Sequence, residues 1–218
     1  VFAAHMPPRL TADTGLDALT HAIEGYTSSW HNEFTDGLCL KAIEMILTFL
    51  PRAYADGDDM EAREKMHNAA TLAGLGFINS LAAAAHALGH SLGAVFHLPH
   101  GRAVSLFLPY SIQFNARGDQ PTRYADIARF LSLPAADVGK STSSLVSAIR
   151  DLQQGVGQPL SIRQAVPGLT PDKFEAKLDK LVDNAEMDAT IVASARDVTT
   201  DDARRLFEYA YQGKDVDF

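Results

Sequence analysis

The chain has 218 residues, of which 46% are apolar and 21% charged, and a formal net charge of −8; this is an ordinary globular composition. The negative charge argues against nucleic acid and anionic membranes as partners, because both attract basic surfaces. A single cysteine, Cys39, excludes an internal disulfide, and no stretch has the pattern of a secretory signal or the roughly 18 apolar residues of a membrane span, so we expect a cytoplasmic protein.

Helical periodicity dominates the first half of the chain. Leu16, Leu19, Ile23 and Tyr26 recur on one face and predict a helix over residues 14–28, and a similar pattern predicts a second helix over 34–54. An Ala-rich stretch at 69–94 follows an acidic break at 56–59, and the high helix propensity of Ala favours helix there. An apolar segment at 103–114 then follows a loop at 96–101.

The second half shows shorter amphipathic helices, separated by joints at residues 117–121, 133–134 and 155–159. Thr170 before Pro171 marks one helix start, and Thr199 with Asp202 marks another as an acidic capping box. Strand-like alternation is nearly absent. The sequence therefore predicts an all-α fold, with residues 1–218 forming a single multi-helix, bundle-like domain.

Four residues from two segments suggest a metal site. Asp17 and His21 are four apart, so a helix places both on one face; His86 and His100 come from a second helix and a loop after it. One carboxylate and three imidazoles suit Fe(II), Zn or another divalent metal acting as a Lewis acid. The alternative is that these histidines are unrelated, some exposed and others hydrogen-bonded in the core.

His90 lies one helical turn beyond His86. It could be a fifth ligand or a proton carrier, and we favour the second role, since a neighbouring imidazole can relay a proton from a substrate oxygen to solvent. The remaining histidines are expected to have no role: His97 in a loop, and His5, His31 and His67 at the surface.

Residues 89–93, Gly-His-Ser-Leu-Gly, match the nucleophile elbow of serine hydrolases, with Ser91 as nucleophile. That elbow requires a strand before the serine, whereas the preceding Ala-rich residues predict a helix. A hydrolase would also need a parallel sheet, for which the sequence gives no signal. We therefore keep a serine hydrolase using Ser91 only as the least favoured alternative.

Residues 7–24 (PPRLTADTGLDALTHAIE), and residues 86–93 (HALGHSLG) with 99–101 (PHG), resemble two signatures of the iron-containing, or group III, alcohol dehydrogenases. The resemblance runs from about residue 7 to the end of the chain and corresponds to the family's C-terminal helical domain, the dehydroquinate synthase-like α domain. It implies that Asp17, His21, His86 and His100 bind Fe(II), Zn or another divalent metal. It also implies that His90 is the catalytic histidine beside the nicotinamide and the substrate.

The reaction that this resemblance implies is the reversible NAD(P)-dependent oxidation of a small alcohol to an aldehyde or ketone, with the metal polarising the substrate oxygen. Family members carry an N-terminal nucleotide-binding domain, and nothing in these 218 residues corresponds to it. We therefore expect a fragment that is inactive without that domain and that could form a homo-oligomer through the face left uncovered. The alternative from another class is a helical metal-binding module without redox chemistry.

Overall fold

The structure is a computed structural model that describes residues 3–118 and 122–218. Within these ranges every regular element is a helix and no strand occurs, so the all-α prediction is confirmed. None of the helices described is long and apolar enough to cross a membrane. The elements are α1 (Pro8–Thr27), α2 (Glu33–Ala55), α3 (Met60–Phe77), α4 (Ala84–Phe96), α5 (His100–Asn115), α6 (Tyr124–Phe130), α7 (Val138–Gly155), α8 (Ile162–Ala165), α9 (Pro171–Glu186), the 3-10 helix η1 (Ala189–Ala193) and α10 (Thr200–Gln212).

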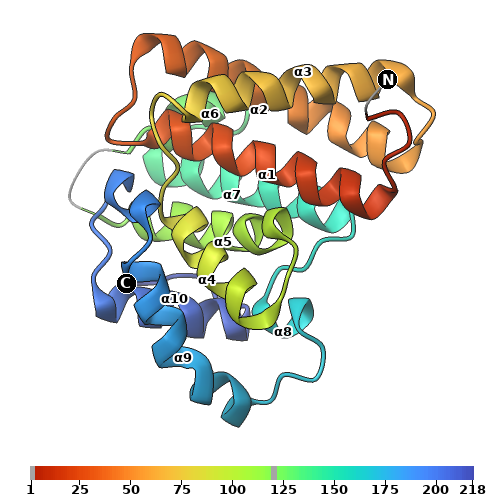
Figure 1. The fold of residues 1–218 in the computed structure, drawn as a ribbon. Coiled ribbons are helices and arrows are strands. Elements are labelled where there is room, and N and C mark those ends of the chain that lie inside the picture. The colour runs from red at the N-terminus through yellow and green to blue at the C-terminus, as the bar shows by residue number, and fades with distance from the viewer. Residues whose placement is uncertain (1–2, 119–121) are drawn as a thin grey trace.

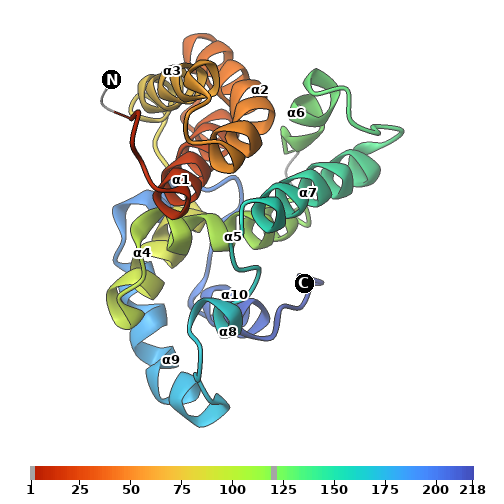
Figure 2. The same cartoon turned by 90° about the vertical axis from the view of Figure 1, so that its right-hand side faces the viewer.

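The helices form two groups that meet at α1, α4 and α5. Helices α1, α2 and α3 pack on one another, and Figure 1 shows α2 and α3 above α1 with α4 and α5 below it. At the opposite end, α9 packs on both α4 and α10. Figure 2 shows α6 and α7 side by side on the flank of the molecule, where α7 contacts α5. The contact between α1 and the α4–α5 pair therefore lies in the middle of the fold.

Helix ends follow the predicted capping signals in the second half. The Thr170 side chain accepts a hydrogen bond from the Lys173 amide, and Thr199 forms a reciprocal capping box with Asp202. The predicted joints at 133–134 and 155–159 lie between helices α6, α7 and α8. Of the joint predicted at 117–121, residues 119–121 lie outside the described residues.

Two boundaries near the predicted site differ from expectation. Helix α1 begins at Pro8, not near residue 14, with Pro8 at the first helical position, where proline is well tolerated. Buried Asp13, in the second turn, pairs with Arg102 of α5 at 3.0 Å. The loop predicted at 96–101 contains only residues 97–99. Consequently His100, which we expected in a loop, is the first residue of α5 and follows the N-cap residue Pro99.

The Ala-rich stretch at 69–94 is not one helix. Helix α3 ends at Phe77, residues 78–83 form a turn in which Leu81 has a φ of 64°, and α4 starts at Ala84. A buried carboxylate from α1, that of Glu24, accepts hydrogen bonds from the amides of Ala83 and Ala85 at the new helix start. Those hydrogen bonds stabilise the break, although local propensity favours a continuous helix.

Candidate metal centre

The four predicted ligands come together at the junction of α1, α4 and α5. Asp17 and His21 project from one face of α1, His86 from α4 and His100 from the start of α5. One ligand atom of each lies within 4.8 Å of one atom of every other. Asp17 Oδ1 is central: it lies 3.2 Å from His100 Nε2, 3.5 Å from His21 Nδ1 and 3.7 Å from His86 Nε2. Two segments that are far apart in sequence thus form one cluster.

Glycines allow these helices to approach closely enough for the cluster to form. A Cβ on Gly101 would lie 2.1 Å from the carbonyl oxygen of Asp13, so α5 contacts the α1 backbone directly. A Cβ on Gly89 would lie 2.5 Å from Val104 Cα, where α4 crosses α5. Any larger residue at either position would push the helices apart.

Two atoms of the cluster are buried without a hydrogen-bond partner among the described residues. They are Asp17 Oδ1 and His86 Nε2, and their side chains are 24% and 2% exposed. Buried polar atoms are rarely left unpaired, and a cation among these four donors would satisfy both at once. The donor set, one carboxylate and three imidazoles, suits a borderline divalent ion and leaves coordination positions for a further oxygen ligand. The residues present therefore fit a metal.

The electrostatics of the cluster match that of a cation site. Burial, and after it the neighbouring His86, lowers the pKa of His21 to about 4, so this imidazole is neutral near pH 7. Burial alone would raise the pKa of Asp17, but the imidazoles of His100 and His86 hold it well below its usual range. For His86, burial alone would lower the pKa. The carboxylates of Glu24 and then Asp17 outweigh this effect and raise the pKa of His86 to about 9. The carboxylates of Glu24 and Asp17 therefore favour positive charge at His86, whereas His21 is held neutral.

Two neighbours hold the cluster in place. The ring of Phe77, at the end of α3, lies 3.9 Å from the ring of His21, measured between centroids. Glu24, which was not among the predicted site residues, has a carboxylate oxygen 2.5 Å from His86 Nδ1. A signal was available: Glu24 follows Asp17 by seven residues and His21 by three, which places all three on one helix face.

His90 lies beside the four-donor cluster without joining it. Its ring is 5.1 Å from that of His100 and 5.7 Å from that of His86, and its side chain is 37% exposed. His90 Nδ1 lies 2.7 Å from a carboxylate oxygen of Asp188, the N-cap residue of η1. Asp188 was also missed, because no local pattern connects it to a histidine 98 residues earlier.

The other candidates are not part of the site. Ser91 lies within α4 and is 2% exposed, and its hydroxyl donates to the Leu181 carbonyl at 2.7 Å, so the geometry of a nucleophile elbow is absent there. His97 ends α4 in the left-handed conformation. His5, His31 and His67 are exposed, as expected.

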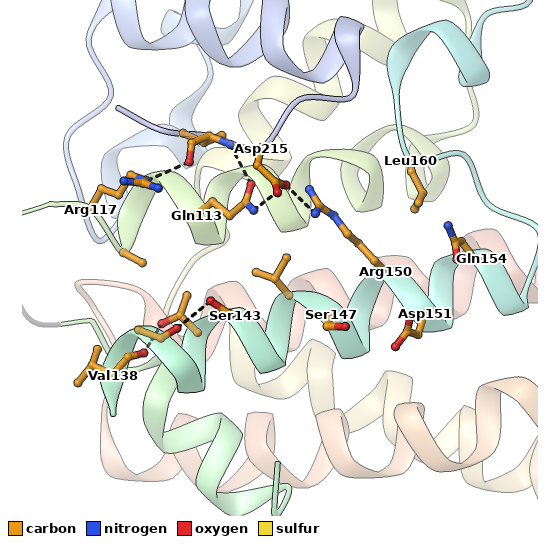
Figure 3. Close-up of a pocket in the computed structure, with 15 residues that line it drawn as sticks. Gln113, Arg117, Val138, Ser143, Ser147, Arg150, Asp151, Gln154, Leu160 and Asp215 are labelled. Atoms are coloured by element: carbon orange, nitrogen blue, oxygen red, sulfur yellow. Dashed lines mark hydrogen bonds and ion pairs between the residues drawn. The ribbon is translucent and has the colours of Figure 1, made fainter. Parts of the chain in front are cut away.

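A separate cavity of about 710 Å³ lies between α5, α7 and the C-terminal segment (Figure 3). Its charged groups are paired with one another: Arg150 lies 2.6 Å from Asp215, which also accepts a hydrogen bond from Gln113. Arg117 donates to the Val216 carbonyl. None of the metal-cluster residues lines this cavity, and its side chains largely satisfy one another.

Comparisons of the sequence and of the structure with known proteins both identify metal-dependent alcohol dehydrogenases and related reductases as similar. A sequence model of the C-terminal part of the Fe-containing alcohol dehydrogenase family matches residues 11–211. The chain is 41% identical over 216 residues to the NADPH-dependent butanol dehydrogenase of Clostridium saccharobutylicum, covering 99% of this chain and 54% of that enzyme. The alcohol dehydrogenase from Oenococcus oeni superposes with a TM-score of 0.86 at 33% identity, over 95% of this chain and 53% of that one. The sulfoacetaldehyde reductase from Bifidobacterium kashiwanohense, solved in complex with NAD+, superposes with a TM-score of 0.83 at 28% identity, over 95% of this chain and 52% of that one. The chain thus spans about half the length of these relatives.

Proposed function

Since the chain belongs to the Fe-containing alcohol dehydrogenase family, we propose that residues 1–218 form the helical, metal-binding domain of an NAD(P)-dependent alcohol dehydrogenase. The observation that carries the proposal is the convergence of four donor atoms within 4.8 Å, two of which are buried and otherwise unpaired. Asp17, His21, His86 and His100 are the proposed ligands of Fe(II), with Zn or another divalent ion as alternatives.

The substrate we propose is a small alcohol, or the corresponding aldehyde or ketone in the reverse direction. The partner is the N-terminal nucleotide-binding domain of the same protein, and the relatives, at about twice the length, have room for one. When bound, a divalent ion supplies Lewis acidity toward the substrate oxygen, while NAD(P) exchanges the hydride.

The chain's own residues have separate tasks in this scheme. The three imidazoles and Asp17 hold the charge that binds and orients an oxygen-bearing substrate. His90, partly exposed at the edge of the cluster, exchanges the hydroxyl proton with solvent. The Asp188 carboxylate accepts a hydrogen bond from Nδ1 of His90, which leaves Nε2 free to carry that proton.

Metal analysis tests the proposal directly. The chain, purified without chelator and incubated anaerobically with Fe(II), or with Co(II) as a stable probe, should hold one ion per chain. Asp17→Ala and His86→Ala should bind it far more weakly, whereas His31→Ala, at an exposed histidine outside the cluster, should keep the wild-type affinity. A wild-type chain that binds no divalent ion, or an Asp17→Ala variant that retains it with unchanged affinity, would overturn the metal site.

The proposed hydride transfer requires a second experiment. The chain joined to the nucleotide-binding domain of a relative should reduce NAD(P) in the presence of a primary alcohol, and His86→Ala should abolish this activity. The isolated chain should show no alcohol-dependent NAD(P) reduction, because the groups that hold the dinucleotide are proposed to lie in the other domain. Metal binding with no hydride transfer in the joined protein would support a non-redox metal module instead.

A further inference from the structure

We infer that Glu24 is a positioning residue for the metal centre, because its carboxylate fixes the orientation and the tautomer of His86. This inference rests on the proposed metal site and adds a residue outside its ligand set. Glu24 lies on α1, on the same face as Asp17 and His21. One helix would therefore supply two ligands and also hold a third, which comes from α4.

The carboxylate of Glu24 is held firmly. Its Oε1 accepts a hydrogen bond from the Ala85 amide at 2.6 Å, and its Oε2 accepts one from the Ala83 amide at 3.0 Å. Oε2 also lies 2.5 Å from His86 Nδ1. The residue is 4% exposed, so water does not compete for these contacts. A carboxylate with three donors in a buried site has little freedom to rotate, and a charge-assisted hydrogen bond of this kind is stronger than a neutral one.

The contact decides which ring nitrogen of His86 faces the cluster. A carboxylate only accepts, so Nδ1 must carry the proton and donate it to Glu24. Nε2 is then the ring nitrogen that faces the cluster, 3.7 Å from Asp17 Oδ1, where it is buried without a hydrogen-bond partner among the described residues. A bound cation would take the place of a proton on this nitrogen. A carboxylate hydrogen-bonded to a metal-ligating histidine fixes its tautomer and increases its basicity, and loss of such a partner typically weakens metal binding 10–100-fold.

The same carboxylate also starts helix α4. No side chain of its own caps α4, which begins among alanines, and the two amides that Glu24 binds are those of the N-cap residue and the second helical residue. A negative charge there is favourable because the amides at a helix start lack intrahelical partners. Glu24 therefore holds the backbone that carries His86 as well as the imidazole ring itself.

The experiment must separate this role from simple support of α4. Glu24→Gln keeps the shape but replaces one acceptor oxygen with an NH2 group that opposes a donor. Glu24→Asp keeps the negative charge but shortens the side chain by one methylene group. Thr20→Val is the matched control: Thr20 is a fully buried polar residue on α1 whose hydroxyl bonds only its own helix, at Leu16 O.

Two readouts apply to each variant: the Co(II) dissociation constant with the visible absorption of the bound ion, and the thermal midpoint of the metal-free chain. We expect Glu24→Gln to weaken Co(II) about 10–100-fold and to shift its absorption band, with Glu24→Asp giving a smaller change in the same direction. Thr20→Val should lower the midpoint while leaving both Co(II) properties at wild-type values.

A double-variant comparison completes the test. If Glu24 acts through His86, adding Glu24→Gln to His86→Ala should not weaken the residual Co(II) affinity further. The inference is overturned if Glu24→Gln, or Glu24→Asp where the Gln variant does not fold, binds Co(II) with the wild-type constant and spectrum. A wild-type chain that binds no ion would be a different result, because that outcome removes the proposed function itself.

Discussion

Replacing Gly101 with alanine should open the metal site without altering a ligand. The new Cβ would lie 2.1 Å from the backbone oxygen of Asp13 and 3.0 Å from Asp17 Cβ, and neither the helix backbone nor the first atom of a side chain can rotate away. Ordinary contact begins at 3.4 Å, so α1 and α5 must separate by about 1 Å. His100, the adjacent residue, moves with α5 and away from Asp17.

The expected loss has two parts. Overpacking of this kind costs roughly 1–3 kcal/mol of folding free energy. Metal–ligand distances tolerate only about 0.2 Å, so a shift of about 1 Å should remove His100 from the site and weaken Co(II) by about tenfold or more. Urea denaturation and chelator competition measure the two quantities separately.

Gly93→Ala provides the matched control for Gly101→Ala. Gly93 lies in α4, and its added Cβ would meet Leu98 O at 3.5 Å and Ala103 Cβ at 3.6 Å, which is ordinary contact. This variant should gain up to about 1 kcal/mol from helix propensity and keep the wild-type Co(II) constant. If Gly101→Ala behaved like Gly93→Ala in both assays, the reasoning that close backbone contact positions His100 would be refuted.

Three further predictions concern other parts of the chain. Gly76→Ala places a Cβ 2.5 Å from Cys39 Sγ, so we expect a loss of about 1–3 kcal/mol in urea denaturation. Gly74→Ala, in the same helix with nothing within 4 Å of its Cβ, should instead gain about 0.5–1 kcal/mol. Adding Cys39→Ala to Gly76→Ala should restore stability, and a double variant no more stable than the single one would show that the contact is not the cause. Because burial raises the pKa of Cys39 to about 12, the native chain should resist DTNB at pH 8 while the urea-unfolded chain reacts; fast labelling of the native chain would contradict this. In the chain joined to a nucleotide-binding domain, Asp188→Asn should lower kcat about tenfold or more while the bound ion is retained, since His90 loses its carboxylate partner; an unchanged kcat would argue against a proton-carrying role.

The sequence was most informative where the signals were local. Apolar residues at helical spacing predicted the bodies of α1 and α2, and the capping residues Thr170 and Thr199 marked two helix starts correctly. The i,i+4 spacing of Asp17 and His21 likewise predicted that both share one helix face. Such patterns depend only on the geometry of a single helix.

Contacts between distant segments were not predictable in the same way. The turn at 78–83 is stabilised by a carboxylate 59 residues before Ala83, whereas the alanines themselves favour helix. The partner of His90 lies 98 residues further along the chain. Glu24 was the exception, because its place on the Asp17 face was visible in the sequence and only its target on α4 was not.

The short connection between α4 and α5 limits how the site can move. Only residues 97–99 join the two helices; His97 has a φ of 56°, and the Leu98 amide bonds the Gly93 carbonyl at 3.2 Å. This three-residue connection is too short for α4 and α5 to move independently. The backbones of His86 and His100 therefore shift together whenever this pair of helices moves. A displacement of the α4–α5 hairpin against α1 would therefore change the distances from both His86 and His100 to Asp17 at the same time.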